Sequence, residues 1–346
     1  MGGKTYRVAQ WATGNTGTHA MKAVVAHPQM ELVGLRVYNP DKVGKDAGEI
    51  AGLGKTLGVK ATDKLEDIIA ARPDAVLYMP QYVVMDDVCA LLEAGINLVT
   101  SITEFHEPEA MDPALRARVE AACQKGQSSV HATGSSPGFI SQTLPFALAT
   151  LVRDIDLYAI DEFADCSSRD SPQMIYEVMG FGRPPSGADD RHTQHIQHSF
   201  GHSLGQTARS LGMPIDRVAA TGEVGTARET LKIAAGTIEK GTVAALRFTV
   251  GGYRGDKMVL RFRANWYVTK DLEQDWELGD TGWRVQVQGG TPLDVRISFP
   301  CSEEDYPNIS PGFTAHPVVN AVPAVCDASP GIKTGADLII LAQMVV

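Results

Sequence analysis

A short apolar run, followed at once by a glycine-containing turn and a helical pattern, opens the sequence. Residues 6–11 are predicted to form a strand, residues 12–17 a turn, and residues 18–27 a helix that ends before Pro28. Residues 31–38 supply a second strand, which gives the length that a parallel βαβ crossover requires. This beginning constrains the fold strongly, because parallel strands joined by a crossover helix belong to α/β sheets.

The alternation of strands and helices continues beyond this unit. Helix, strand, helix, strand, helix and strand are predicted in turn at residues 63–71, 74–79, 84–94, 97–100, 108–125 and 128–133. Regular alternation of this kind indicates an α/β fold with an N-terminal, doubly wound, mostly parallel sheet, which is the Rossmann architecture.

The sequence changes character from about residue 154. Runs rich in β-forming residues surround a helical middle, and they lie at residues 156–165, 242–250, 257–268, 283–288 and 294–300. This pattern predicts a second, α+β domain built on an antiparallel sheet. The tail from residue 314 again has a helical pattern.

The first turn has the composition of a dinucleotide site. A pyrophosphate group binds backbone N–H groups at a helix start, with glycines where a Cβ would block its approach. Ala12-x-Gly14-x-x-Gly17 stands at such a strand-to-helix junction, although alanine replaces the first glycine, and an ordinary tight turn is the alternative. We therefore assign the cofactor pyrophosphate to the whole turn, Ala12, Thr13, Gly14, Asn15, Thr16 and Gly17.

The end of the second strand decides between the two nicotinamide cofactors. An acidic residue there would bind the ribose 2′-hydroxyl, whereas cations would accept a 2′-phosphate. Arg36, Asn39 and Lys42 can surround a phosphate, so we expect NADP(H) to be preferred. Asp41 keeps NAD(H) possible.

Length and composition bound the remaining possibilities. A chain of 346 residues exceeds what one core usually serves, so we expect a dinucleotide-binding Rossmann domain at residues 1–140 and a substrate-binding α+β domain at residues 141–312. A helical tail at residues 313–346 is expected to return to the first domain. The net charge of −10 and the lack of a basic stripe argue against a nucleic-acid partner.

The cysteines and the N-terminal residues predict where the protein resides. The five cysteines are far apart and form no CxxC pair, which fits reduced thiols. The first residues lack an apolar signal core, and no apolar stretch reaches membrane-spanning length. We therefore expect a cytoplasmic protein without a membrane partner.

Five short segments carry distinctive motifs, at residues 10–17 (QWATGNTG), 43–48 (VGKDAG), 99–104 (VTSITE), 134–139 (GSSPGF) and 320–323 (NAVP). Together they resemble the dihydrodipicolinate-reductase-like superfamily, and within it the amine dehydrogenases, a branch that includes 2,4-diaminopentanoate dehydrogenase. Dihydrodipicolinate reductases themselves carry paired histidines, a lysine and a Ser-Gly-Thr element. The corresponding residues 161–172 lack all of these, which argues against a role in lysine biosynthesis.

The resemblance implies an NAD(P)H-dependent enzyme that aminates a small ketone or aldehyde with ammonia, or deaminates an amine in the reverse direction. It assigns the acid-base role to Glu104, which follows a predicted strand; a helix-capping or surface carboxylate is the alternative. Two other functions stay open, namely an imine or carbonyl reductase and a dinucleotide-binding regulator without turnover. A homodimer is expected by analogy with similar proteins.

Further residues are assigned to the cofactor. They follow predicted strands or lie in the returning tail, and they are Pro80, Ser101, Gly134, Ser135, Pro137 and Asn320. An interdomain hinge is the alternative for the turn at residues 134–139, and a helix cap is the alternative for Asn320.

A substrate pocket is predicted from apolar and histidine side chains in the second domain and in the segment that immediately precedes it. The candidates are Phe139, Tyr176, Met179, Phe181, His195 and His198, with Met213 nearby. Core packing is the alternative for the apolar members. The histidines at 192, 195, 198 and 202 have a spacing that brings them to one face of a helix, but no HExxH motif or acidic ligand accompanies them, so no metal is expected. An apolar wall would favour small aliphatic or cyclic ketones.

Overall fold

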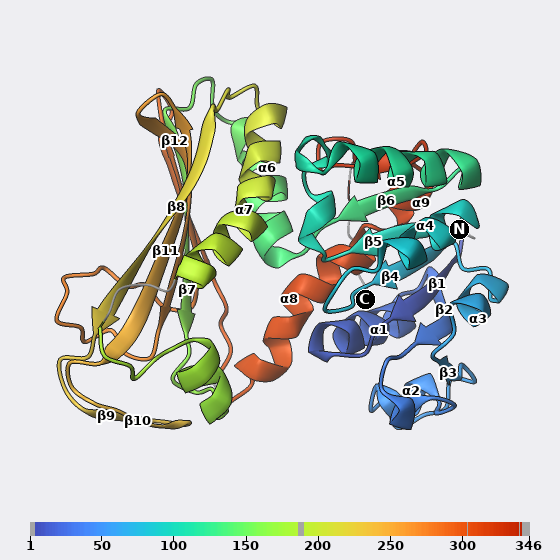
Figure 1. Ribbon diagram of the computed structural model, residues 1–346, viewed down its shortest axis with the longest axis horizontal. Helices are drawn as coiled ribbons and strands as arrows, with labels where there is room; N and C mark the ends of the chain where they lie inside the picture. The colour runs from blue at the N-terminus through green and yellow to red at the C-terminus, as the bar shows by residue number, and fades with distance from the viewer. Residues whose placement is uncertain (1–3, 186–189, 303, 339, 341–346) are drawn as a thin grey trace. The chain divides into compact units, whose positions relative to one another are not determined.

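The computed structural model describes residues 4–185, 190–302, 304–338 and 340, and it divides into two units (Figure 1). Unit 1 comprises residues 1–139 and 308–346, and unit 2 comprises residues 140–307. Each unit contains one large sheet with its own helices. In the described part of the chain, no helix is both long and apolar enough to cross a membrane.

Unit 1 is built on a seven-stranded sheet in which all of the strand pairs are parallel. Its spatial order is β15 (Gly331–Lys333), β6 (Ser129–Ala132), β5 (Asn97–Thr100), β4 (Ala75–Tyr78), β1 (Tyr6–Trp11), β2 (Met30–Arg36) and β3 (Ala61–Thr62). The chain runs outward from β1 to β3, then returns to β4 and runs outward on the other side. The predicted doubly wound parallel sheet is confirmed. The order in which the chain adds strands changes sense between β1 and β4.

Helices accompany these strands. They are α1 (Asn15–Ala26), α2 (Ala47–Ile50), α3 (Leu65–Ala70), α4 (Met85–Glu93), α5 (Pro113–Gly126), α8 (Tyr306–Asn320) and α9 (Val322–Cys326), with short turns η1 (Pro40–Lys42), η2 (Thr103–Phe105) and η3 (Pro108–Ala110). The helix predicted from residue 108 begins at Pro113 instead. The Asp112 carboxylate caps it by accepting the N–H of Leu115 at 2.9 Å.

Buried side chains form a separate apolar cluster on each face of this sheet. Alternate residues of one strand point to opposite faces, so Val8 joins the cluster that includes Met21 of α1 and Val318 of α8. Trp11 joins the other cluster, which includes Leu91 of α4. The C-terminal helices therefore complete the core that the N-terminal strands begin.

Unit 2 is built on a six-stranded sheet with the order β14 (Leu293–Ser298), β13 (Gly282–Gln288), β7 (Leu157–Asp165), β12 (Lys257–Tyr267), β11 (Val243–Arg254) and β8 (Arg217–Thr226). Neighbouring strands are antiparallel except β7 and β12, which are parallel, so the sheet is mixed. The other elements are η4 (Ser135–Thr143), α6 (Leu144–Ala149), η5 (Gln173–Val178), α7 (Asp190–Ser210) and the hairpin of β9 (Leu231–Ile233) and β10 (Gly236–Ile238).

Helix α7 packs on one face of this sheet (Figure 1). The rings of Phe200 on α7 and Phe262 on β12 are stacked with their centroids 3.7 Å apart. Residues alternate along β12, so Arg261 and Arg263 point to the opposite face. The second sheet therefore has one apolar face under a helix and one face that carries charged side chains.

Candidate functional site

The carboxyl ends of four strands stand in line across the sheet of unit 1. Trp11 pairs with Tyr78, Tyr78 with Thr100, and Thr100 with Ala132, and these are the last residues of β1, β4, β5 and β6. The segments that follow these strands therefore leave the sheet along one edge. They carry the predicted cofactor residues Ala12–Gly17, Pro80, Ser101 and Gly134, as well as Glu104.

The turn after β1 makes different demands on its three small residues. Ala12 has a φ of +75°, a left-handed conformation that favours glycine. A methyl group at Gly17 would lie 2.4 Å from the carbonyl oxygen of Ala12, so glycine is required there by packing. Gly14 caps α1, and the space around its Cα is open, with no atom within 4 Å of a methyl group placed there.

Two polar side chains hold this turn. The amide Nε2 of the buried Gln10 donates to the carbonyl oxygens of Trp11 and Ala12 at 3.2 and 3.0 Å. The ammonium of Lys42 donates to the Thr13 hydroxyl at 2.9 Å and to the Thr13 carbonyl oxygen at 3.2 Å. The positive charge of Lys42 therefore lies on the turn itself.

The geometry of this turn fits a dinucleotide pyrophosphate. The N–H groups of the first turn of α1 have no acceptor within the helix, and they carry the positive end of the helix dipole. Open space at Gly14 allows an anion to approach them, and Asn15 is exposed beside it. Lys42 adds a cation at the same place.

The end of β2 presents Arg36 between two aromatic rings. The guanidinium carbon lies 5.0 Å from the ring centroid of Trp11 and 4.7 Å from that of Tyr38, and Nη1 donates to the Val37 carbonyl oxygen at 2.5 Å. Trp11 donates its indole N–H to the Tyr38 hydroxyl at 2.9 Å. Asn39 lies just beyond and caps η1 by accepting the N–H of Asp41 at 2.9 Å.

Glu104 lies in η2, four residues after the end of β5, and its side chain is partly buried. Its Oε2 accepts a long hydrogen bond of 3.4 Å from the Thr103 hydroxyl. The neighbouring Phe105 is buried in the core of unit 1, which anchors the short turn. A carboxylate is thus held at the sheet edge that also carries residues 12–17, the candidate phosphate turn.

The turn at residues 134–139 contacts the C-terminal helix of the same unit. The Ser135 hydroxyl lies 2.8 Å from the Thr314 hydroxyl on α8, and the Phe139 N–H donates to the Gly134 carbonyl oxygen at 2.7 Å. The peptide bond between Ser136 and Pro137 is cis. Asn320 is the last residue of α8 and is partly buried. Segments far apart in the sequence therefore meet at this turn.

The predicted substrate residues of unit 2 occupy several environments. Phe181 and Met179 are buried, with exposed fractions of 1% and 9%. Tyr176 on η5 donates its hydroxyl to the Thr237 carbonyl oxygen of β10 at 3.2 Å. His195 and His198 are exposed on α7.

The four histidines of α7 lie in two environments. The ring of His192 faces Phe248 of β11 at 6.4 Å, whereas His198 and His202 contact each other edge to face at 4.6 Å. With about 3.6 residues per turn, His195, His198 and His202 fall within about 60° of one another around the helix, and His192 lies beyond the edge of this arc. In the described residues, no group of three or more His, Cys, Asp or Glu side chains is arranged to hold a metal ion.

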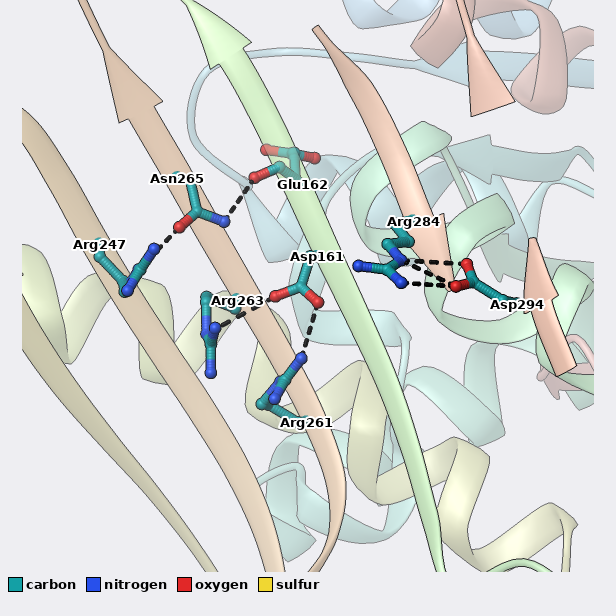
Figure 2. Close-up of polar contacts among 8 residues, drawn as sticks. All are labelled: Asp161, Glu162, Arg247, Arg261, Arg263, Asn265, Arg284 and Asp294. Atoms are coloured by element: carbon teal, nitrogen blue, oxygen red, sulfur yellow. Dashed lines mark hydrogen bonds and ion pairs between the residues drawn. The ribbon is translucent and has the colours of Figure 1, made fainter. Parts of the chain in front are cut away.

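Charged side chains cluster on the face of the second sheet opposite α7 (Figure 2). Asp161 of β7 accepts from Arg261 at 2.6 Å, and Arg263 lies 3.6 Å from its other oxygen. Arg247 donates to Asn265 at 2.8 Å, and Asn265 donates to the backbone carbonyl oxygen of Glu162 at 3.1 Å. The Asp161 side chain is only 9% exposed, and burial lowers the pKa of the Arg247 and Arg263 guanidinium groups.

Comparison with known proteins decides the family. An amine dehydrogenase from Streptomyces virginiae is 30% identical over 347 residues, which cover 95% of this chain and 94% of that protein. The chain belongs to the amine dehydrogenase family. Such an enzyme is an oxidoreductase that depends on NAD or NADP, in agreement with the phosphate turn of unit 1.

Two family models match successive parts of this amine dehydrogenase family member. Residues 11–132 match the dihydrodipicolinate reductase N-terminus, and residues 187–346 match the 2,4-diaminopentanoate dehydrogenase C-terminal domain. The sequence resemblance to this branch of the superfamily is confirmed.

Solved structures agree on the fold. The structure of an amine dehydrogenase from Mycobacterium smegmatis has a TM-score of 0.76 at 19% identity and covers 98% of this chain and 97% of that chain. GenD2 from gentamicin A biosynthesis, in complex with NAD, has a TM-score of 0.53 at 14% identity and covers 97% and 90% of the two chains. The amine dehydrogenase architecture thus extends over both units.

Four residues at the candidate site were not assigned a role from the sequence. Gln10 supports the turn, Trp11 and Tyr38 enclose Arg36, and Thr314 meets Ser135. Gln10 left one signal, since it is a polar residue within an apolar strand. The others depend on contacts between separate segments, which sequence spacing does not reveal.

Proposed function

We propose that this chain joins ammonia to a small ketone or aldehyde with NADPH as the preferred reductant, and that it runs the reverse deamination of an amine. The observation that carries the proposal is the position of Glu104 at the sheet edge of the phosphate turn. The name of the Streptomyces virginiae relative supports the same reaction class.

The proposed role of Glu104 follows from the chemistry. A ketone and ammonia form a carbinolamine, which must lose water to give an iminium ion, and a carboxyl group can donate the proton that this step needs. The resulting carboxylate then stabilises the iminium cation electrostatically. The reduced nicotinamide supplies the hydride when bound. The turn of α1, Lys42 and Arg36 hold the cofactor, with Pro80, Ser101, Gly134, Ser135, Pro137 and Asn320 toward its nicotinamide end.

Two finer points accompany this proposal. The apolar side chains of Phe139, Tyr176, Met179 and Phe181 favour small aliphatic or cyclic carbonyl compounds, with His195 and His198 as the polar members of the substrate region. We further propose that two copies of the chain form a homodimer through the sheet face of unit 2 that carries Asp161, Arg261 and Arg263, because a two-fold contact lets acidic groups of one copy meet basic groups of the other.

The test is Glu104→Gln, assayed for reductive amination over a panel of ketones with ammonia. We expect kcat to fall by about 10²- to 10⁴-fold, the usual contribution of a positioned acid or base. The dissociation constant of NADPH should not change. Glu109→Gln is the matched control, since Glu109 is exposed in the next turn and forms a surface ion pair with Arg116.

Full activity of Glu104→Gln would overturn the assigned role. Product formed equally well without ammonia would identify a carbonyl reductase instead. Both outcomes are measured with the same panel of ketones. Product analysis distinguishes the amine of a reductive amination from the alcohol of a carbonyl reduction.

A further inference from the structure

A second candidate binding site lies in unit 2, at the end of the sheet where β7 and β12 finish. It is a cavity of about 350 Å³ formed by residues of unit 2 alone, and it shares no residue with the phosphate turn or with Glu104. The side chains that matter for its chemistry are Asp165, Tyr267, Asp280, Phe299, Cys301 and Tyr306.

The cavity has a net negative charge. Asp165 ends β7, and its Oδ1 accepts the N–H of Ser167 at 2.9 Å, which fixes the carboxylate at the strand end. Asp280 is ion-paired with Lys270, so these two charges cancel. Burial raises the pKa of the Tyr267 phenol, and the carboxylates of Asp165 and Asp280 raise it further, so this hydroxyl stays neutral. Among the described residues that line the cavity, one uncancelled negative charge remains, that of Asp165.

Aromatic rings form a large part of the wall, beside the hydroxyl groups of Ser168, Thr281, Ser298 and Ser302 and the Lys270 ammonium, which lies 5.9 Å from the Tyr267 ring centroid. Tyr267 donates its hydroxyl to the Gly279 carbonyl oxygen at 2.7 Å, which fixes its ring. The ring centroid of Phe299 lies 6.3 Å from that of Tyr306, and Phe299 also meets Trp283 edge to face at 5.0 Å. The rings are thus held by their neighbours before any ligand binds.

A carboxylate beside aromatic faces is suited to an organic cation. A primary ammonium forms charge-assisted hydrogen bonds to the carboxylate, and aromatic faces attract the cation and cover its apolar body. The volume lies at the lower end of the range for small-molecule pockets. A divalent metal would need more ligands, and in the described part of the chain no three His, Cys, Asp or Glu side chains are grouped to provide them.

We propose that this cavity binds a small primary ammonium compound, with Asp165 as its counter-ion and the rings of Tyr267, Phe299 and Tyr306 around its apolar body. The inference does not depend on the role of Glu104. It assigns to unit 2 an amine-binding site of its own, beyond the proposed reaction.

Cys301 offers a direct readout, because this thiol lines the cavity and is partly exposed. Cys89, Cys123 and Cys166 are buried, so Cys326→Ser removes the other partly exposed thiol. In this background, the rate of Cys301 modification by a neutral pyridyl disulfide is measured with benzylamine or with benzyl alcohol, at matched ionic strength. At about ten times the dissociation constant, benzylamine should slow the modification about tenfold, whereas benzyl alcohol should not.

Variants make the test decisive. Asp165→Asn keeps an oxygen that can accept the Ser167 N–H but removes the charge, so protection by benzylamine should disappear while the melting temperature is retained. Asp256→Asn, in the exposed turn between β11 and β12, is the matched control and should keep the protection. Glu104→Gln should also keep it, which separates this site from the proposed reaction.

Equal protection by the alcohol, or protection that survives Asp165→Asn, would overturn the proposal. So would the absence of protection at all amine concentrations. Circular dichroism of each variant shows whether it is folded.

Discussion

Single residues of the phosphate turn show why a degenerate motif can keep its geometry. Ala12 occupies the first glycine position of the motif and still adopts the left-handed conformation, at φ +75°. Glycine is required at position 17 because a Cβ would clash with the Ala12 carbonyl oxygen. At position 14 a Cβ would meet no protein atom, but it would occupy space that a ligand needs. The sequence predicted the turn and its position, whereas the different reasons for each glycine follow only from the surrounding atoms.

We predict that Gly14→Ala and Gly17→Ala fail in different ways. A methyl group at Gly14 meets no atom, so the free energy of unfolding should change by less than about 1 kcal/mol, as for ordinary helix-cap changes. Cofactor affinity should fall at least about tenfold, because the methyl group occupies the approach to the helix N-terminus. Gly17→Ala should cost about 1–3 kcal/mol of stability through the clash with Ala12.

Calorimetry and cofactor titration measure both quantities. Unchanged NADPH binding by a folded Gly14→Ala variant would show that the pyrophosphate lies elsewhere.

We predict that Arg36 makes a large contribution to the proposed preference for NADP(H). Arg36→Ala should raise the Michaelis constant for NADPH by about 10- to 100-fold, the usual worth of hydrogen bonds to a charged group, and that for NADH by far less. Lys45→Ala is the control, because Lys45 is exposed and pairs with Glu49 on the surface. If both constants rose equally, Arg36 would contact a part that the two cofactors share.

At the scale of elements, strands with continuous burial were predictable, whereas two of the edge strands were missed and a third, β14, was predicted. The first and last residues of β1 and of β5 are those predicted from the sequence. Such strands are recognisable because buried parallel strands are largely continuous apolar runs. Strand β8 was missed, since most of its residues are exposed or only partly buried at the sheet edge. The three-residue β15 was missed as well, because its pairing with β6 is set by distant segments.

The pair of β6 and β15 contains a pH-sensitive contact. His131 of β6 donates through Nδ1 to the Lys333 carbonyl oxygen of β15 at 2.8 Å, and burial lowers the pKa of this histidine. In the unfolded chain the His131 imidazole takes up a second ring proton near pH 6.5. In the folded chain it does so only at lower pH. The folded state therefore loses stability as the pH falls below about 6.5, with a slope of up to about 1.4 kcal/mol per pH unit.

We predict that His131→Gln removes this slope. Urea unfolding between about pH 7.5 and pH 5 should show a smaller loss of stability in the variant than in the wild type. His195→Gln, at an exposed position of α7, should keep the wild-type dependence. His19 and His27 are present in both proteins, so their own lowered pKa values cancel in the comparison. Identical slopes in wild type and His131→Gln would refute the assignment.

At the scale of the whole molecule, the charged sheet face of unit 2 sets the expected assembly. Sequence alternation predicted the sheet, but the cluster of Asp161, Arg261 and Arg263 depends on the parallel register of β7 and β12, which spacing does not reveal. The parallel pair also explains why the second sheet is mixed rather than wholly antiparallel.

We predict that Arg263→Glu weakens the proposed homodimer. The change reverses a charge on the proposed contact face, so acidic groups of the two copies would oppose each other, and like charges across an interface cost several kcal/mol. Light scattering after gel filtration should give the mass of one chain for the variant and of two chains for the wild type, and circular dichroism shows that the variant is folded. Arg254→Glu, at the exposed end of β11, should remain dimeric. A dimeric Arg263→Glu protein would place the subunit contact elsewhere.

The two ends of the chain are both needed for unit 1, since β15 extends its sheet beside β6 and α8 completes its core. A ribosome releases residues in order, so unit 2, which is continuous in sequence, is available to fold while the last strand of unit 1 is still being made. We therefore expect a nascent chain to acquire dinucleotide affinity only after residues 306–333 have left the ribosome. Cofactor capture would then follow the folding of unit 2 rather than precede it.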